Sequence, residues 1–319
     1  MSFSIPRDVA GGGGGKVGSG GGGSSKTATP PSSSSGPLGT FRLTLPIASY
    51  RRALCDAVTN SRACIVAGET GSGKTTQLPA FLLEEGVVDA IAKAEGKKVG
   101  SLGILITQPR RVAAVTVARR MSAEANEARG PAGAACIGHR VRFDDATTWR
   151  TRIVVATDGV LLREASSDGT LSAYGIIILD EAHERSLATD VLFGVVLRAM
   201  MLRPALRVIV MSATLDTDLF RSFFSNFLNG EIPAHITVPG RSFPVTLYHA
   251  PMPVENYVEA ALTAVLQIAQ EAGNEKGDIL VFLTGVEDID DLSTLIRKHS
   301  YNKEGGEEEE GKERRRKKK

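Results

Sequence analysis

The residues best suited to chemistry lie in "GETGSGKTT" (68–76), which fits the spacing G-x-x-x-x-G-K-[ST]. Glycines in such a loop let successive backbone N–H groups turn inward around a phosphate, and a following helix N-terminus adds a favourable dipole. Lys74 supplies a positive charge for the β- and γ-phosphates of a nucleotide, and the Thr75 hydroxyl is a ligand for Mg²⁺. This spacing favours a phosphate loop over a chance glycine-rich turn. The predicted nucleotide contacts are Gly68, Glu69, Thr70, Gly71, Ser72, Gly73, Lys74, Thr75 and Thr76.

A second reactive group, Asp180 and Glu181, ends the apolar run of "IIILDEAH" (176–183). A buried strand would deliver both carboxylates to its carboxyl end, where Asp180 can hold Mg²⁺ and Glu181 can orient or deprotonate an attacking water. The alternative is a helix N-cap followed by a first-turn acid. His183 invites a zinc or base interpretation, but no second His or Cys stands at ligand spacing. A polar relay between the nucleotide and neighbouring loops is the better hypothesis for His183.

The elements that must position these groups are short, nearly all-apolar runs, which are typical of buried parallel strands. Helix-like segments, for example 111–125 and 190–200, separate the runs. This alternation predicts an α/β fold with a parallel sheet and helices on both faces. Ligands of such sheets bind at the carboxyl ends of the strands, where both reactive groups are expected. The predicted strands are 63–67, 103–107, 152–157, 175–180 and 207–212.

The composition argues against several classes of protein. The 319 residues carry a formal net charge of only +2, so overall charge does not indicate a nucleic-acid binder, and no apolar stretch predicts a membrane span. Three widely spaced cysteines predict neither a zinc site nor a disulfide framework. The Gly/Ser-rich residues 1–40 and the charged residues 303–319 are expected to be disordered. The final "RRRKKK" is either a nuclear or nucleic-acid-binding signal or a solubilising tail.

Several stretches together resemble the DEAH-box ATP-dependent RNA helicases, especially the pre-mRNA-splicing members. They stand in the order found in that family and cover roughly residues 44–297. The stretches are "GETGSGKTT" (68–76), "TQPRRVAA" (107–114), "GHRVRFDD" (138–145), "TDGVLLRE" (157–164), "LDEAHERS" (179–186), "SAT" (212–214), "PGRSFPV" (239–245) and "FLTG" (282–285). The resemblance implies two RecA-like lobes of the P-loop NTPase class, with ATP and Mg²⁺ between them. It also implies RNA and ribonucleoprotein partners in splicing and a nuclear, otherwise cytoplasmic, location.

The resemblance implies roles for single residues as well. Ser212 and Thr214 match the motif that links hydrolysis to strand movement, and Arg120 is placed against the nucleotide base. Arginines at a strand end could bind phosphates without reading sequence, although a solvated helix start is the alternative. The residues at the nucleotide and catalytic positions are Lys74, Thr75, Asp180, Glu181 and His183. The residues in motifs that line the RNA path of the first lobe are Arg110, Arg111, Thr157 and Asp158.

The same likeness predicts where the lobes divide. The first lobe is expected over 41–249, and a linker helix with the start of the second lobe over 250–302. "GDILVFLTGVEDIDDL" (277–292) is interpreted as the opening strand, turn and helix of that lobe, with Thr284 in an RNA-contacting loop. We therefore expect a chain truncated early in the second lobe, which binds Mg-nucleotide but, without an arginine finger, turns it over slowly. The alternative is a stand-alone ATP-binding switch or decoy in an RNA–protein assembly.

Overall fold

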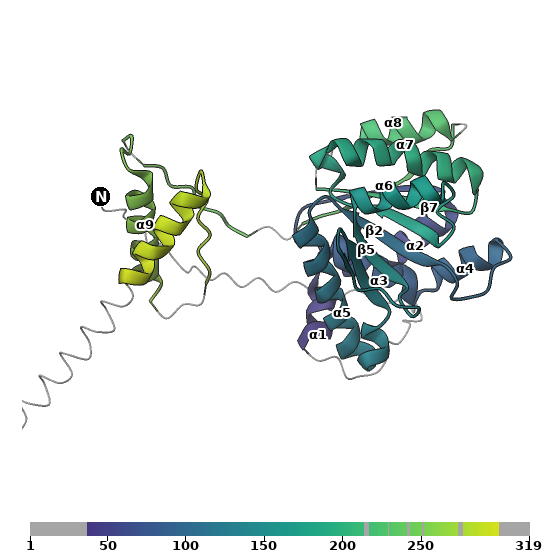
Figure 1. Ribbon diagram of the computed structural model, residues 1–319, viewed down its shortest axis with the longest axis horizontal. Coiled ribbons are helices and arrows are strands. Elements are labelled where there is room, and N and C mark those ends of the chain that lie inside the picture. The colour runs from purple at the N-terminus through teal and green to yellow at the C-terminus, as the bar shows by residue number, and fades with distance from the viewer. Residues whose placement is uncertain are drawn as a thin grey trace, which may run out of the picture. The chain divides into compact units, whose positions relative to one another are not determined.

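The computed structural model describes residues 37–213, 217–228, 230–240, 243–250, 252–273 and 277–299. The chain divides between residues 242 and 243 into two compact units. In the larger unit, helices surround a sheet (Figure 1). The described part of this sheet has eight strands in the order β4-β3-β5-β2-β6-β7-β1-β8. The strands are β1 (Ala63–Gly68), β2 (Gly103–Gln108), β3 (Ile137–Val141), β4 (Asp144–Asp145), β5 (Ile153–Thr157), β6 (Tyr174–Leu179), β7 (Arg207–Ser212) and β8 (Ala234–Val238).

Neighbouring strands in this sheet are parallel, except for the antiparallel pair of β3 and β4. Strand β1 lies between β7 and β8, with Cys64 opposite Ile209 on one side and Ala234 on the other. Because the strands are parallel, their carboxyl ends meet at one edge of the sheet. This arrangement confirms the predicted α/β class.

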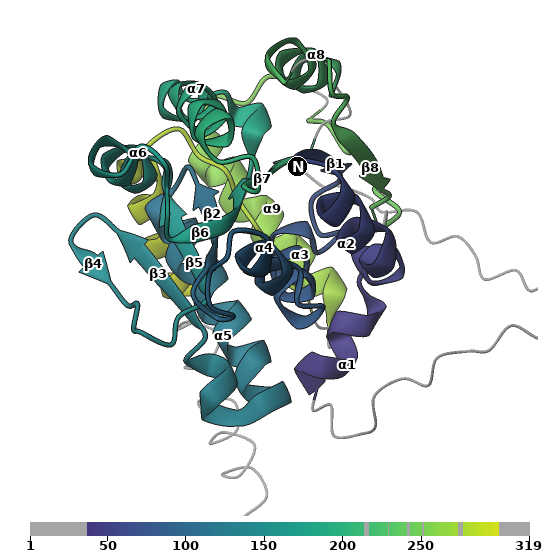
Figure 2. The same cartoon turned by 90° about the vertical axis from the view of Figure 1, so that its right-hand side faces the viewer.

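Helices cover both faces of the sheet (Figure 2). Buried side chains of α2 to α5 belong to one hydrophobic cluster, and those of α6 to α8 belong to the other. The helices of the larger unit are α1 (Pro37–Thr44), α2 (Arg51–Asn60), α3 (Lys74–Glu84), α4 (Val87–Ala94), α5 (Arg111–Ala134), α6 (Asp158–Ser167), α7 (Leu187–Leu202) and α8 (Asp218–Phe227), with short 3-10 helices η1 (Pro46–Tyr50) and η2 (Ala182–Glu184).

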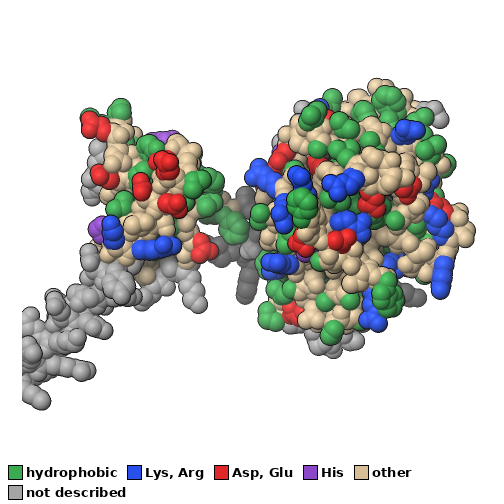
Figure 3. Space-filling view, in the orientation of Figure 1, with side chains coloured by type: hydrophobic (Ala, Val, Ile, Leu, Met, Phe, Trp, Pro, Cys, Tyr) green, Lys and Arg blue, Asp and Glu red, His purple; other side chains and the backbone are tan. Residues whose placement is uncertain are grey.

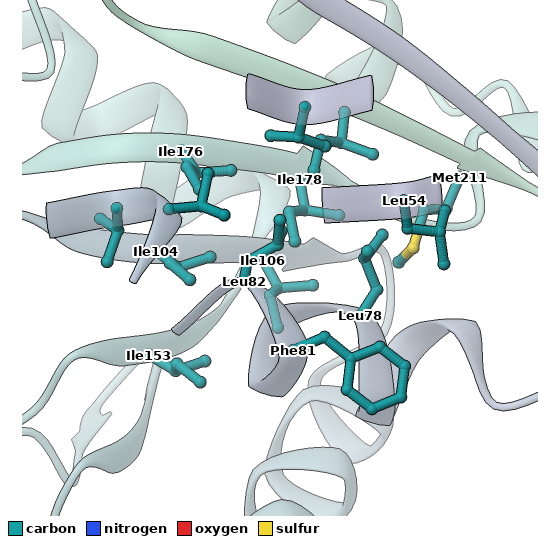
Figure 4. Packing of buried hydrophobic residues seen from close by; sticks show 14 of the residues in the cluster. Leu54, Leu78, Phe81, Leu82, Ile104, Ile106, Ile153, Ile176, Ile178 and Met211 are labelled. Carbon is teal, nitrogen blue, oxygen red and sulfur yellow. The ribbon is translucent and has the colours of Figure 1, made fainter. Parts of the chain in front are cut away.

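Alternation along the strands divides the apolar residues between the two layers. Ile104 and Ile106 of β2 pack with Leu78 and Leu82 of α3, whereas Leu105 belongs to the opposite cluster (Figure 4). Because both faces of the central strands β1, β2, β5, β6 and β7 are covered, these strands are largely apolar. The same pattern made them recognisable in the sequence, and all five predicted strands correspond to observed ones within one residue at either end.

Three strands were not predicted: β3, β4 and β8. Both β3 and β8 mix polar and apolar residues, since β8 lies at one edge of the sheet and β3 is covered on its outer side only by the two-residue strand β4. A strand at or near the edge of a sheet is less completely buried, so its residues need not all be apolar. Helix α1 was not predicted either, and it overlaps the end of the segment expected to be a disordered tail.

The smaller unit, from residue 243 onward, has two described helical segments, α9 (Tyr257–Ala272) and residues 286–299. Asn256 caps α9, and its side chain accepts from the N–H groups of Val258 and Glu259. The prediction of a strand at 278–284 was wrong, because residues 277–283 have no regular secondary structure. A strand needs a partner for its backbone hydrogen bonds, and the described part of this unit offers none.

Some predictions fall on residues that the structure does not describe. These are Thr214, most of the N-terminal tail and the charged tail with its final basic run. Among the described helices, none has the length and apolar character needed to cross a membrane.

Candidate active site

The phosphate loop follows β1 and ends in α3, as the sequence predicts. Gly71 and Gly73 have φ values of +83° and +93°, which favour glycine. A Cβ atom at Gly73 would meet Leu45 and Ile47 at 3.0 Å, and the Ile47 N–H donates to the Ser72 carbonyl at 3.1 Å. Leu45 and Ile47, which precede α2, therefore pack against the outer side of the loop and support it.

Lys74 is the first residue of α3, and its side chain is buried within the loop. Its ammonium donates to the Gly68 carbonyl, to the Glu69 carbonyl at 2.9 Å and to the Ser72 hydroxyl at 3.3 Å. Burial lowers the pKa of Lys74, while the negative charges of Asp180, Glu181 and Glu69 oppose that shift. The carboxylates thus help to keep a positive charge where phosphate oxygens would be bound.

Asp180 follows β6 and lies opposite the phosphate loop. Its Oδ2 accepts from the Thr75 hydroxyl at 2.6 Å and from the Gln108 side-chain amide, and its Oδ1 accepts from the Glu181 N–H at 2.9 Å. Burial raises the pKa of this carboxyl to about 6, against the lowering effect of the Thr75 hydrogen bond. Gln108 ends β2, and sequence reasoning did not single it out as a site residue.

His183 lies between Glu181 of the acidic pair and Ala213, the residue that follows β7. Glu181 has a φ of +54°, a strained conformation for a residue other than glycine, and functional sites are where such strain is concentrated. Its Oε2 lies 3.5 Å from His183 Nε2, and the Ala213 N–H donates to His183 Nδ1 at 3.2 Å. Because Nδ1 accepts that hydrogen bond, the neutral imidazole carries its proton on Nε2, facing Glu181.

A hollow lies between the phosphate loop and the helices α1 and α5. The Arg120 guanidinium lies over the Phe41 ring, 5.4 Å from its centroid, and its Nε donates to Glu124 Oε1 at 2.6 Å. The buried Glu124 also accepts from Gln77 of α3 at 2.9 Å. Phe41 was missed because one aromatic residue beside a Gly/Ser-rich segment carries no recognisable pattern. The hollow is lined by Phe41, Leu45, Arg120, Glu124, Glu181 and residues 70–76.

The protein side chains fit a magnesium ion bound together with a substrate. Within the described residues, no group of three or more His, Cys, Asp or Glu could by itself hold a metal. Mg²⁺ normally keeps several waters and uses one or two protein oxygens plus substrate phosphates. The contact of Thr75 with Asp180 provides that minimal pair of oxygens beside the loop.

The first-lobe residues predicted to contact RNA lie at the same edge of the sheet. Arg110 and Arg111 follow β2 and are exposed, and Arg110 pairs with Glu184 of η2 at 3.2 Å. Thr157 ends β5 and is partly buried. The side chain of Asp158 is only 4% exposed, and its Oδ2 accepts from the Thr189 hydroxyl of α7 at 2.6 Å. The RNA contact of Asp158 remains a prediction.

The remaining two predicted residues are Ser212 and Thr284. Ser212 is buried at the end of β7, directly before Ala213, which contacts His183. Thr284 belongs to the smaller unit, and its hydroxyl donates to Asp288, which also accepts from the Tyr257 hydroxyl at 2.9 Å. The RNA contact of Thr284 remains a prediction.

A phosphate loop and an acidic strand end at one edge of a parallel sheet define a P-loop nucleoside-triphosphate-binding domain. Residues 49–221 match the DEAD/DEAH box helicase family, and the chain belongs to this family. Residues 180–183 read Asp-Glu-Ala-His, the DEAH form of the motif.

The chain is also similar to a curated protein of Schizosaccharomyces pombe, the pre-mRNA-splicing factor ATP-dependent RNA helicase prp22. The two are 43% identical over 256 residues, which make up 80% of this chain and 20% of the relative. The chain thus spans about a fifth of the length of that protein.

Proposed function

We propose that the chain is the ATP-binding part of a DEAH-type RNA helicase, in which ATP hydrolysis is coupled to RNA remodelling. The observation that carries this proposal is the contact of Thr75 with Asp180 at 2.6 Å, because it joins the phosphate loop to the acidic motif. Membership of the helicase family and the likeness to a splicing helicase support it.

In this proposal the chain's own residues hold the triphosphate and prepare water for attack. The glycine-rich loop and Lys74 bind the phosphate chain, and Arg120 and Phe41 border the base. Thr75 and Asp180 would hold Mg²⁺, which neutralises phosphate charge. Glu181 orients the attacking water or accepts its proton, and His183 positions the Glu181 carboxylate.

RNA would lie along Arg110, Arg111 and Thr157, close to the nucleotide. The ion pair of Arg110 with Glu184 links this segment to the acidic motif, since Glu184 lies in η2 directly after it. A strand that draws Arg110 toward a phosphate would compete with Glu184 for the guanidinium. This competition is a physical route by which RNA changes the catalytic loop.

The decisive experiment measures ATP binding and single-turnover hydrolysis separately. Lys74→Ala should abolish ATP binding, whereas Lys93→Ala, which removes a surface lysine of α4, should leave it unchanged. Glu181→Gln should retain ATP binding and lower hydrolysis roughly a hundredfold or more. Equal ATP affinity in the wild type and Lys74→Ala would refute the proposed site.

We also propose that this 319-residue chain binds ATP much better than it turns ATP over. Among the described residues, the cationic side chains that line the hollow are Lys74 and Arg120, and Arg120 is engaged by Glu124. An arginine directed at the γ-phosphate accelerates such reactions about 10³- to 10⁵-fold. Rapid steady-state hydrolysis by the purified chain would contradict this part of the proposal.

The likeness to a pre-mRNA-splicing factor supports a role in splicing and a nuclear location for this protein. The test is ultraviolet crosslinking of the tagged protein in cells, followed by sequencing of the bound RNA. Recovery of intron-containing transcripts from the nuclear fraction is the expected result. Recovery of mature messenger or ribosomal RNA alone would remove the assignment to splicing.

A further inference from the structure

Gln108 places a polar side chain at the buried end of β2. It follows the apolar residues of that strand and is 3% exposed. Side chains alternate along a strand, so Gln108 lies on the same face as Ile104 and Ile106, which pack with residues of α3. A polar group taken out of water is costly unless it finds a hydrogen-bond partner. The partner of Gln108 therefore indicates why a glutamine stands at this position.

That partner is Asp180, the acid of the proposed metal site. The side-chain amide of Gln108 donates to Asp180 Oδ2, the same oxygen that accepts from the Thr75 hydroxyl at 2.6 Å. A carboxylate can only accept, so the amide nitrogen of Gln108 faces it. The Glu181 N–H donates to the other oxygen, Oδ1, at 2.9 Å. Donors from three separate places in the chain therefore restrict the rotation of this carboxylate.

The contact is shielded from solvent. Charged side chains of both signs lie on the surface of the larger unit, where water and salt weaken their interactions (Figure 3). Asp180, in contrast, is only 2% exposed, and Gln108 is buried beside it. A hydrogen bond in such a low-dielectric setting is electrostatically stronger than one in water. Gln108 can therefore hold the Asp180 side chain in one orientation.

A neutral amide suits a carboxylate that must bind a cation. A lysine or arginine in place of Gln108 would also donate to Asp180, but its charge would offset that of the carboxylate and repel Mg²⁺. An apolar residue would remove one of the hydrogen bonds to Oδ2. Glutamine orients the acid and leaves the negative charge of the acid for the metal.

We propose that Gln108 is a positioning residue, which orients Asp180 for Mg²⁺ and thereby sets the affinity of the nucleotide-bound protein for the metal. This inference rests on the proposed ATP-binding function, because the metal would be bound together with a nucleotide. Gln108 acts through Asp180 and is not itself a metal ligand. Removing a hydrogen-bond partner of a metal ligand typically costs about 10- to 100-fold in metal affinity, which is the effect expected here.

Gln77 provides a matched control. It is also a buried glutamine, and its side-chain amide also donates to a buried acid, Glu124 Oε2, at 2.9 Å. Glu124 contacts Arg120 at 2.6 Å, on the side of the hollow away from the acidic motif. Gln77→Met therefore removes a buried amide of the same size without removing a contact of Asp180.

The experiment measures the dissociation constant of Mn²⁺, a paramagnetic substitute for Mg²⁺, by electron paramagnetic resonance of the 319-residue chain saturated with ADP. Gln108→Met, which keeps the length of the side chain but removes the donor, should raise this constant roughly 10- to 100-fold. Gln77→Met should leave it within about twofold of the wild type. The affinity of Gln108→Met for ADP in EDTA should be unchanged, since the phosphate loop is intact. Gln108→Leu, which also lacks the donor, repeats the measurement if the methionine variant does not fold.

A double-mutant cycle tests whether Gln108 acts through Asp180. Asp180→Asn removes the charge that attracts the metal and should weaken Mn²⁺ binding by itself. If Gln108 works by orienting that carboxylate, Gln108→Met should weaken Mn²⁺ binding by no more than about twofold further in the Asp180→Asn background. A purely structural role for Gln108 would instead give two independent losses that multiply.

Three results would overturn the inference while leaving the proposed function in place. These are an unchanged Mn²⁺ affinity in Gln108→Met, losses that multiply in the double variant, and an equal loss of ADP affinity in EDTA. The last result would show that the substitution disturbs the phosphate loop in general. If the wild type binds no ADP, or if Asp180→Asn binds Mn²⁺ as tightly as the wild type, the proposed nucleotide and metal site fails together with this inference.

Discussion

The Thr75 hydroxyl lies 2.6 Å from Asp180 Oδ2, which joins the first turn of α3 to the end of β6. Each partner alone has an ordinary structural explanation, as a helix residue and as a residue after a strand. Together they place a hydroxyl and a carboxylate, both suited to Mg²⁺, beside a glycine-rich loop. The contact is therefore more informative about function than either motif by itself.

Removing the buried charge of Asp180 should stabilise the chain in the absence of nucleotide and metal. Its pKa is raised to about 6, so between about pH 4 and 6 the folded state binds more protons than the unfolded state. Above this window the buried charge costs on the order of 3 kcal/mol, and below it the cost disappears. In EDTA, Asp180→Asn should therefore raise the thermal midpoint by a few degrees near pH 8 and hardly at all near pH 4.

Asp56→Asn is the matched control, because it removes the same charge from an exposed position of α2. It should change stability by less than about 0.5 kcal/mol at either pH. A lower midpoint for Asp180→Asn near pH 8 would show that its hydrogen bonds outweigh the cost of its burial.

The two nitrogen atoms of His183 can be tested one at a time. His183→Gln keeps a polar group near the position of Nε2 for Glu181, and His183→Asn keeps an acceptor near the position of Nδ1 for the Ala213 N–H. If orientation of Glu181 limits hydrolysis, His183→Asn should slow single-turnover hydrolysis roughly tenfold or more, with the glutamine variant close to the wild type. ATP affinity should be similar in all three proteins, and equal hydrolysis rates would contradict the assignment.

Phe41 should contribute to binding of the base but not of the phosphates. The stacked pair of Phe41 and Arg120 lies beside the loop, so Phe41→Ala should weaken ATP binding about two- to fivefold. Binding of inorganic tripolyphosphate, which has no base, should be unchanged. Leu43→Ala removes an exposed apolar side chain from the same helix and serves as the control. A parallel loss of tripolyphosphate binding would indicate a general disturbance of the loop.

Gly68 should be intolerant of any side chain. A Cβ atom there would lie 2.5 Å from the Val238 carbonyl oxygen of β8, a backbone atom that cannot move without disturbing the sheet. Gly68→Ala should lower the free energy of unfolding by about 1–3 kcal/mol. Gly194→Ala in α7, where nothing lies within 4 Å, should raise it by about 0.5–1 kcal/mol. Denaturant titrations of the two variants should therefore shift in opposite directions.

Buried parts of the fold could be predicted from the sequence, and edge parts could not. Ile176 and Ile178 lie in a strand covered on both faces, so the run around them is apolar and recognisable. His139 and Arg140 interrupt β3, where their side chains pair with Asp144 and Asp145 instead of packing in a core. No periodicity in the sequence reveals a strand whose polar residues are satisfied by such local pairs.

The phosphate loop and the acidic strand end followed from spacing, because both have fixed positions relative to their strands. Contacts between distant segments did not follow from spacing. Gln108 reaches Asp180, and Phe41 reaches Arg120, only because the fold brings their elements together. The hydrogen bond of Asp158 with Thr189 is another tertiary contact that the spacing of residues in the sequence does not reveal.

The position of β1 has a consequence for how the protein forms during synthesis. The strand that leads into the phosphate loop pairs with β7 and β8, which leave the ribosome long after it. Until then the apolar residues of β1 have no partner strand in the sheet, and pairings between such distant segments are slow. An unpaired apolar strand of this kind is prone to aggregate while the rest of the chain is being made. In the finished sheet, Gly68 at the start of the phosphate loop pairs with Val238 of β8, so this loop reaches its final position only once the late strands have arrived.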